Sequence, residues 1–380
     1  MYSLFFLVLF IIKTNKMKST SISNEFTREL VINIFRHGKR NEIINYKTQE
    51  EDGQMTVEGI TEIKEKAKLF YTTYLQDRKL EPKKDISYYI SNSRRTIQTA
   101  LSRLSVYCNN EQLERLDKKE LVSEYNAIFD EYMYNAFLFG DKIIMNYVEN
   151  NGQYKKLIAS IKETLNLINP RLINILNEYN NCKYYDNYPL SEYFKYIYII
   201  DYLNNHHNQN ELSNDEKELK RVLNEFNTYK TILDITNEEN NINILFVNRI
   251  MINIEKEIKL SMTSNKSLSK QLVMFSGHDF TLSAILKAFK INRKNYHYDF
   301  NDEINIILLK NQTNQYFIKM LYNNSEIKFP FCDKDLCKVE QFLQYIKSKF
   351  HYSNEEMIEY CKGKTKDLIQ KKYKQNNEDL

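Results

Sequence analysis

Two short histidine motifs contain the residues of this sequence best suited to do chemistry. The first, at 36–40, reads Arg-His-Gly-Lys-Arg, and the second, at 277–279, reads Gly-His-Asp. A phosphate monoester brings nearly two negative charges, and guanidinium groups bind its oxygens in pairs, which lysine cannot do. A neutral imidazole nitrogen among such groups can attack phosphorus and form a covalent intermediate. The residue types therefore predict phosphoryl chemistry.

Each residue of the two motifs has an expected role. His37 is the expected nucleophile, and neighbouring arginines should lower its pKa and keep it neutral in acid. Asp279, beside His278, is the natural proton donor to the leaving alkoxide and the natural base for the water that follows. Gly38 and Gly277 should let a ligand approach the backbone. The guanidinium groups expected around the phosphate are those of Arg36, Arg40 and Arg95.

Structural explanations compete with these roles. Asp279 could have a purely structural role, as the cap of a helix that begins near Phe280. Arg95 could lie on a helix surface, with Arg94 as the phosphate ligand instead. His37 could be a core histidine, although its two flanking arginines argue against an apolar setting. The remaining histidines are interpreted as structural or solvated: His206, His207, His297 and His351.

The elements that must position the motifs alternate between strand and helix. Apolar runs at 30–35, 86–91 and 271–276 predict buried strands, and the first and last lead directly into the histidine motifs. Apolar residues at three- and four-residue spacing predict helices that begin near Thr56 and Thr96. Because ligands of open α/β sheets bind at the carboxyl ends of the strands, the two histidines should converge on one ligand.

This alternation predicts an α/β fold with a mostly parallel central sheet flanked by helices and a helical cap insertion. Few breakers, with 7 Gly and 4 Pro, favour helices over an all-β sandwich. Two late strands, at 303–310 and 315–322, should form a hairpin. The predicted parts are a signal peptide at 1–23, an α/β core at 24–108 and 242–350, a helical cap insertion at 109–241 and a polar C-terminal tail at 351–380.

Charge and hydropathy restrict the partners and the compartment. The net charge is +4 without a concentrated basic stretch, so nucleic acid is not an expected partner. The apolar run at 1–12 is followed by lysines and is too short to cross a bilayer, which predicts a signal peptide, with a buried N-terminal strand as the competing interpretation. We expect no stable membrane span after signal removal, and a secreted or lysosomal/vacuolar protein.

The five cysteines show no metal-ligand spacing and no histidines cluster with them, so no metal and no cofactor are expected. In an oxidising compartment Cys332 and Cys337 are close enough in sequence to close a small loop, although the sequence does not fix the pairing. Glycosylation sequons at Asn265, Asn311 and Asn323 agree with secretion, but an Asn-rich chain has such triplets by chance.

Taken together, these motifs resemble the histidine phosphatase superfamily, in particular the histidine acid phosphatases. The segments that carry the resemblance are 36–40, 53–56, 95–96, 278–279 and 322–337. They match, in order, an Arg-His-Gly-x-Arg strand end, a Gly-Gln-Leu-Thr-like helix start, an Arg-Thr pair, a late His-Asp and a Tyr-Asn followed by two cysteines. The resemblance covers roughly residues 30 to 350, and the insertion matches by position rather than by motif.

The resemblance implies an α/β core with a helical cap, no metal requirement and activity in acid. It also implies His37 as nucleophile, Asp279 as proton donor and four phosphate ligands: Arg36, Arg40, Arg95 and His278. The His-Asp pair points toward acid phosphatases and phytases and away from the inositol polyphosphate branch. Two departures are Glu42, where the family often has proline, and the loop at 91–94. An acidic residue near the mouth argues against highly anionic substrates such as phytate.

The sequence thus predicts an acid phosphatase that hydrolyses phosphate monoesters, either small or carried on a protein, through a phosphohistidine. The alternative from another class is a catalytically inactive member of the same fold that only binds a phosphate ligand. A phosphotransferase or mutase using the same phosphohistidine is disfavoured by the long insertion and the signal peptide. The physiological substrate and a homodimeric state stay open.

Overall fold

The computed structural model describes residues 25–40, 54–75, 80–91, 93–114, 152–179, 212–226, 243–263, 269–291, 298–334 and 336–353, with single residues between 192 and 203 and at 356. Several features named above lie outside these residues: the predicted signal peptide, Glu42, Asn265, the histidines His206, His207 and His297, and most of the polar tail. Within the described part of the chain, no helix has the length and apolar character needed to cross a membrane.

A seven-stranded sheet forms the centre of the protein, and its first half is parallel. β1 (Phe26–Arg36) pairs in parallel with β3 (Leu272–Gly277), which pairs in parallel with β2 (Ile86–Ile90). The register places Arg36 opposite Gly277, so β1 and β3 end side by side. The apolar runs that predicted these three strands are all strands in the structure.

The second half of the sheet is antiparallel. β4 (Glu303–Asn311) pairs with the other edge of β1 and, through a tight turn, with β5 (Tyr316–Tyr322), which confirms the predicted hairpin. β6 (Ser325–Ile327) and β7 (Cys337–Lys338) both pair with β5 in antiparallel fashion. Since β5 runs antiparallel to β4, it points the same way as β1, β2 and β3. The α/β class with a central sheet flanked by helices is confirmed.

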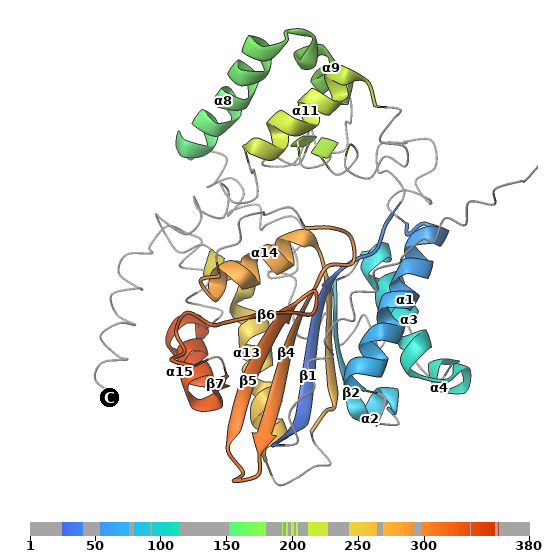
Figure 1. Cartoon of the computed structure of the whole chain (residues 1–380), viewed down its shortest axis with the longest axis vertical. Helices are drawn as coiled ribbons and strands as arrows, with labels where there is room; N and C mark the ends of the chain where they lie inside the picture. The colour runs from blue at the N-terminus through green and yellow to red at the C-terminus, as the bar shows by residue number, and fades with distance from the viewer. Residues whose placement is uncertain are drawn as a thin grey trace, which may run out of the picture.

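Helices cover both faces of the sheet, in the arrangement shown in Figure 1. α1 (Val57–Tyr74) and α3 (Arg94–Tyr107) pack against one face, where they meet Val31 and Phe35 of β1. The opposite face packs Leu30, Ile32 and Ile34 of β1 against three helices, α13 (Asn243–Met262), α14 (Asp279–Ala288) and α15 (Val339–Phe350). Successive side chains of a strand point to opposite faces, so β1 supplies both apolar layers. Two short helices, α2 (Pro82–Asp85) and α4 (Asn110–Glu114), were not predicted.

Three further helices pack on one another around an apolar cluster of their own. They are α8 (Gly152–Ile168), α9 (Arg171–Tyr179) and α11 (Asn214–Glu225). Figure 1 shows them beyond the end of the sheet at which β1 and β3 finish. The helical spacing of their leucines and isoleucines predicted α8 and α9 but left α11 unnoticed. The boundaries of the insertion, at 109 and 241, stay a prediction.

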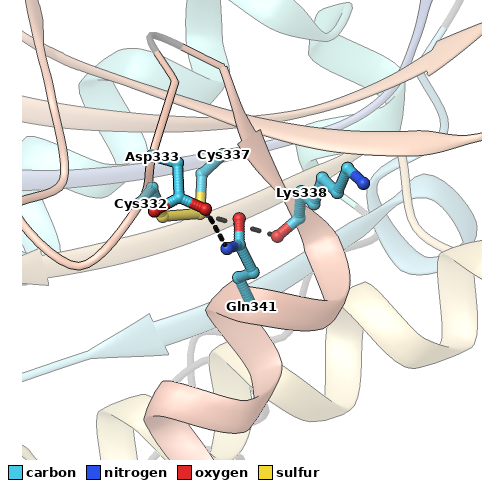
Figure 2. Close-up of a disulfide and its surroundings, with 5 residues drawn as sticks. All are labelled: Cys332, Asp333, Cys337, Lys338 and Gln341. Carbon is cyan, nitrogen blue, oxygen red and sulfur yellow. Dashed lines mark hydrogen bonds between the residues drawn. A yellow bond between two sulfur atoms is a disulfide. The ribbon is translucent and has the colours of Figure 1, made fainter.

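A disulfide joins Cys332 to Cys337, the pair that the sequence allowed (Figure 2). It links the segment after β6 to the start of β7, and Gln341 of α15 donates a hydrogen bond to Asp333 inside the same loop, at 3.0 Å. Among the cysteines that the structure describes, Cys108 is the free one, and it is buried. The disulfide therefore closes a short loop just before α15, and the pairing of β7 with β5 attaches that loop to the sheet.

Candidate active site

The backbone of His37 is fixed on both sides at the end of β1. Its N–H donates to the carbonyl oxygen of Gly277 at 3.0 Å, which continues the pairing of β1 with β3. Its own carbonyl accepts from the N–H of Asn301 at 3.1 Å. The side chain is buried, with 3% of its surface exposed. The topology therefore places this histidine at the carboxyl end of a central strand, where an α/β sheet binds its ligands.

The His37 ring has one nitrogen engaged by the backbone. Nδ1 lies 2.8 Å from the carbonyl oxygen of Gly38. A carbonyl can only accept a hydrogen bond, so Nδ1 carries the proton of the neutral ring and Nε2 carries the lone pair. A backbone contact made by the neighbouring residue thus assigns Nε2 as the nucleophilic atom.

Burial and surrounding positive charge keep this ring neutral. Burial lowers the pKa of His37 well below 6.5, and the charges of Arg95, Arg36, His278 and Arg40 lower it further. Both effects disfavour the imidazolium form, one by removing water and the other by repulsion between like charges. His37 therefore keeps its lone pair in a pH range where an ordinary histidine is protonated.

The second histidine motif lies beside the first. His278 follows β3 and is the N-cap of α14, with its N–H donating to Thr281 Oγ1 at 3.0 Å. The rings of His37 and His278 have centroids 5.4 Å apart. His278 Nε2 lies 2.9 Å from Ser91 Oγ and its Nδ1 lies 3.4 Å from a terminal nitrogen of Arg95. Burial, and then Arg95, lower the pKa of His278 well below 6.5, with Asp279 opposing them.

Asp279 forms an ion pair with the first arginine of the site. Its Oδ2 lies 3.0 Å from Arg36 Nη2. The Arg36 side chain is almost completely buried and also donates to the carbonyl oxygen of Tyr298. Asp279 is the first residue of α14, whereas the N-cap is His278, so the alternative in which Asp279 caps a helix from Phe280 is wrong. The carboxylate is directed at the arginine.

The ring of Phe300 lies close to both arginines of the first motif and to His37. The guanidinium carbon of Arg36 lies 4.4 Å from the centroid of the Phe300 ring, and that of Arg40 lies 6.0 Å from it. The ring of His37 is 5.5 Å away. A cation over an aromatic face is stabilised electrostatically, most of all where water is excluded. Phe300, which no sequence motif indicated, therefore orders both arginines beside the nucleophile.

The structure brings the whole predicted set together at one edge of the sheet: His37, His278, Asp279, Arg36, Arg40 and Arg95. Arg94 is exposed on α3. The predicted use of Gly38 and Gly277 as room for a ligand is not what the packing shows. A Cβ on Gly38 would lie 2.2 Å from Ile63 of α1, and one on Gly277 would lie 2.5 Å from Thr281 of α14. Both glycines let a helix approach the strand end.

A buried polar cluster beneath the site escaped the sequence reasoning. Arg103 Nη2 forms an ion pair with Glu303 at 2.8 Å, and the two side chains are 0% and 1% exposed. Arg103 also donates to Asn33 at 2.9 Å and to Asn301 at 3.0 Å. Arg103 lies on the buried face of α3, where the sequence did not predict a charged residue. The available signal was Asn33, a polar residue inside an apolar strand.

The charged side chains at this end of the sheet suit an anion. Within the residues that the structure describes, no group of three or more His, Cys, Asp or Glu side chains could hold a metal ion. The charges gathered around His37 belong to arginines, whose groups bind anions and not cations. The arrangement can bind a tetrahedral oxyanion and present a nucleophilic nitrogen to it.

No family model matches the chain, and no curated protein matches its sequence. Its fold is similar to that of the Citrobacter braakii phytase, with a TM-score of 0.56, 11% identity and coverage of 88% of this chain and 99% of the phytase. The Hafnia alvei phytase in complex with tartrate has a TM-score of 0.54 and 10% identity, and the match covers 86% of this chain and 98% of the phytase. The Bifidobacterium longum multiple inositol polyphosphate phosphatase in its apo form has a TM-score of 0.52 and 11% identity, and the match covers 90% of this chain and 96% of the phosphatase. The chain therefore has the fold of these phytases and of this phosphatase.

Proposed function

We propose that this protein is an acid phosphatase that hydrolyses phosphate monoesters through a phosphohistidine on His37. The observation that carries the proposal is the state of one atom. His37 Nε2 keeps its lone pair because Nδ1 is bonded to a carbonyl and because burial and arginine charges lower the pKa of the ring. Such a nitrogen, surrounded by guanidinium groups, is suited to attack a phosphorus atom whose oxygens those groups neutralise.

Phosphate binding comes first in the proposed mechanism. Arg36, Arg40 and Arg95 take the phosphate oxygens, and His278 adds a further contact. Arg36 is already ion-paired with Asp279 at 3.0 Å, so a bound phosphate competes with that carboxylate for the guanidinium. Arrival of the substrate thus loosens Asp279 from Arg36, and the released carboxylate takes up a proton from the acidic solvent or from a protonated substrate. The pair couples ligand binding to the availability of the proton donor.

Two chemical steps follow. His37 Nε2 forms a bond to phosphorus while the bond to the leaving oxygen breaks, and Asp279 gives that oxygen its proton. The ionised Asp279 then removes a proton from water, whose oxygen attacks phosphorus and displaces His37. Inorganic phosphate leaves and the neutral imidazole is restored. No cofactor takes part in this sequence.

The comparisons support a phosphatase without naming its substrate. The similar folds include phytases and a multiple inositol polyphosphate phosphatase, and one phytase was solved with myo-inositol hexakis sulphate. Both branches share the fold, so the fold does not choose between them. We propose a small phosphate monoester as the substrate class. The helices α8, α9 and α11 belong, in this proposal, to a cap at 109–241 that selects it, in a protein that is secreted or directed to a lysosome or vacuole.

The decisive experiment is hydrolysis of p-nitrophenyl phosphate from about pH 3 to about pH 9, with a chelator present, by the wild type and His37→Ala. His351→Ala is the matched control, because His351 lies at the end of α15 and contacts Glu255. We expect an acid optimum that survives the chelator, persists in the control and disappears in His37→Ala. A rapid alkaline quench, under which phosphohistidine survives, should show one phosphoryl group by mass. Activity retained without His37 would refute the mechanism, and a wild type that binds phosphate without turnover would favour the binding-only alternative.

A further inference from the structure

The buried pair of Arg103 and Glu303 invites a functional explanation because stability alone explains it poorly. Removing two charges from water costs several kcal/mol each, and apolar residues of similar size often stabilise a core equally well. Here the pair lies directly below the catalytic edge, with a 2.8 Å contact and almost no exposed surface. Such a pair can instead fix the orientation of neighbouring groups, because the planar guanidinium fork holds several hydrogen-bond acceptors in fixed positions.

Arg103 uses that fork to hold three acceptors at once. Besides Glu303, it bonds Asn33 of β1 through Nη1 and Asn301 through Nη2, while its guanidinium lies 4.1 Å from the centre of the Phe35 ring. Asn33 and Phe35 belong to the strand that ends at His37. The fork therefore ties the nucleophile's own strand to the segment containing Asn301.

Asn301 passes this restraint on to the nucleophile. Its N–H donates to the carbonyl of His37 at 3.1 Å, and its own carbonyl accepts from Lys66 Nζ at 2.7 Å. Its backbone is left-handed, with φ at 66°, a conformation that asparagine tolerates better than most residues. The preceding residue, Phe300, packs on His37 and the arginines. A shift of Asn301 would therefore move both the backbone and the aromatic neighbour of His37.

We propose that Arg103 and Asn301 are positioning residues for the nucleophile: Arg103 fixes the side chain of Asn301, and Asn301 fixes the carbonyl of His37. This inference rests on the proposed function, because it assigns a role toward the reacting nitrogen. Both residues act through His37, not on the substrate. Loss of the restraint should slow the attack on phosphorus with little effect on phosphate binding, because Arg36 keeps its ion pair with Asp279 of α14 when Phe300 shifts.

Asn301→Gly tests the restraint with little disturbance. Glycine keeps the left-handed backbone and the N–H to His37 but removes the side chain that Arg103 holds. Arg103 keeps its contacts with Glu303 and Asn33, so no buried charge is left alone. Asn314→Gly is the matched control, because Asn314 has a similar φ of 62° in the turn between β4 and β5.

We expect Asn301→Gly to lower kcat and the rate of phosphohistidine formation by about 10- to 100-fold, with KM and inhibition by inorganic phosphate little changed. Arg103→Lys, which keeps the charge beside Glu303 but loses the fork, should act in the same direction. Asn314→Gly should match the wild type. Unchanged kcat with a lowered unfolding temperature in Asn301→Gly would show a merely structural role and overturn the inference while the proposed function stands. Absence of turnover in the wild type would refute the proposed function, and the positioning role with it.

Discussion

Glu303→Gln should destabilise the folded protein strongly, although it changes one side chain at the start of an apolar strand. Glutamine keeps the size and one acceptor of Glu303 but removes the negative charge that faces Arg103 at 2.8 Å. The side chain of Arg103 is fully buried, so its charge would remain in the interior without a counter-ion. The acceptors left to the guanidinium would be neutral, among them Asn33, Asn301 and the new amide oxygen.

The expected loss follows from that burial. Removing one member of a buried ion pair costs about 3–5 kcal/mol, because the partner keeps its desolvation cost. Several neutral acceptors remain for Arg103, so we expect the lower end, about 3 kcal/mol in the free energy of unfolding. That is a large share of the roughly 5–15 kcal/mol that stabilises a typical protein. Far-UV circular dichroism during urea unfolding measures it, since the chain has no tryptophan to report by fluorescence.

Glu218→Gln is the matched control for this substitution. Glu218 pairs with Arg221 at the same distance, 2.8 Å, but the side chains are 35% and 48% exposed. Water and salt screen such a surface pair, so we expect no measurable change in stability. A loss in Glu303→Gln no greater than in Glu218→Gln would refute the argument from burial.

The stability difference between the wild type and Glu303→Gln should also depend on pH in a definite direction. Burial raises the pKa of Glu303, but the charges of Arg103 and Lys66 outweigh it and leave the pKa below 4.5. A carboxylate with a lowered pKa stabilises the fold above its unfolded value and loses that contribution as the pH falls through its folded value. The difference between wild type and Glu303→Gln should therefore persist at about pH 5 and shrink only below pH 4.5.

Three further outcomes can be checked on the same protein. Asp279→Asn should keep phosphate binding but lower kcat by about 100-fold or more, because an amide cannot donate the proton; an unchanged kcat would contradict the assigned role. Arg95→Gln should raise the pKa of His37, on which Arg95 is the strongest charge, and so move the acid limb of kcat/KM to higher pH; a limb that does not move would refute that coupling. Replacing Cys332 and Cys337 by serine opens a bridge with a sequence separation of 5 and should cost about 2 kcal/mol, while kcat stays unchanged below the unfolding transition; a variant as stable as wild type would show that the bridge adds nothing.

Much of the fold was readable because each element carries its own local signal. The buried parts of β1 and β3 are mostly apolar, as expected for strands buried on both faces, and α1 begins where Thr56 caps the N–H of Gly59 at 2.9 Å. α11 was missed even though Ser213 and Glu216 form a capping box at its start. Its buried positions are Leu219, Val222 and Leu223, and its mostly charged sequence hid them.

The site was readable to the extent that sheet geometry determines it. Two histidines that directly follow neighbouring parallel strands must lie close together, and their rings are 5.4 Å apart. The sequence could not show that Arg103 and Glu303 pair across the core, because their separation along the chain is long and no motif contains them. Nor could it show that Asn301 is left-handed or that Phe300 lies against His37. These are tertiary contacts, and residue type alone does not determine them.

In acid, the proposed mechanism needs a neutral His37 and an ionised Glu303. The pKa of His37 is lowered because the ring is buried among arginines, so the nucleophile stays neutral. The pKa of Glu303 is lowered because the charges of Arg103 and Lys66, with hydrogen bonds from Arg103 and Asn33, together outweigh burial, so the pair beneath the site stays charged. If either group had its ordinary pKa, acid would protonate it and remove the lone pair or the counter-ion of the fork. On the proposed mechanism, burial and the arginines around His37 keep the reacting nitrogen unprotonated, and Arg103 keeps Glu303 ionised beneath it, so guanidinium charge contributes to both requirements for turnover in acid.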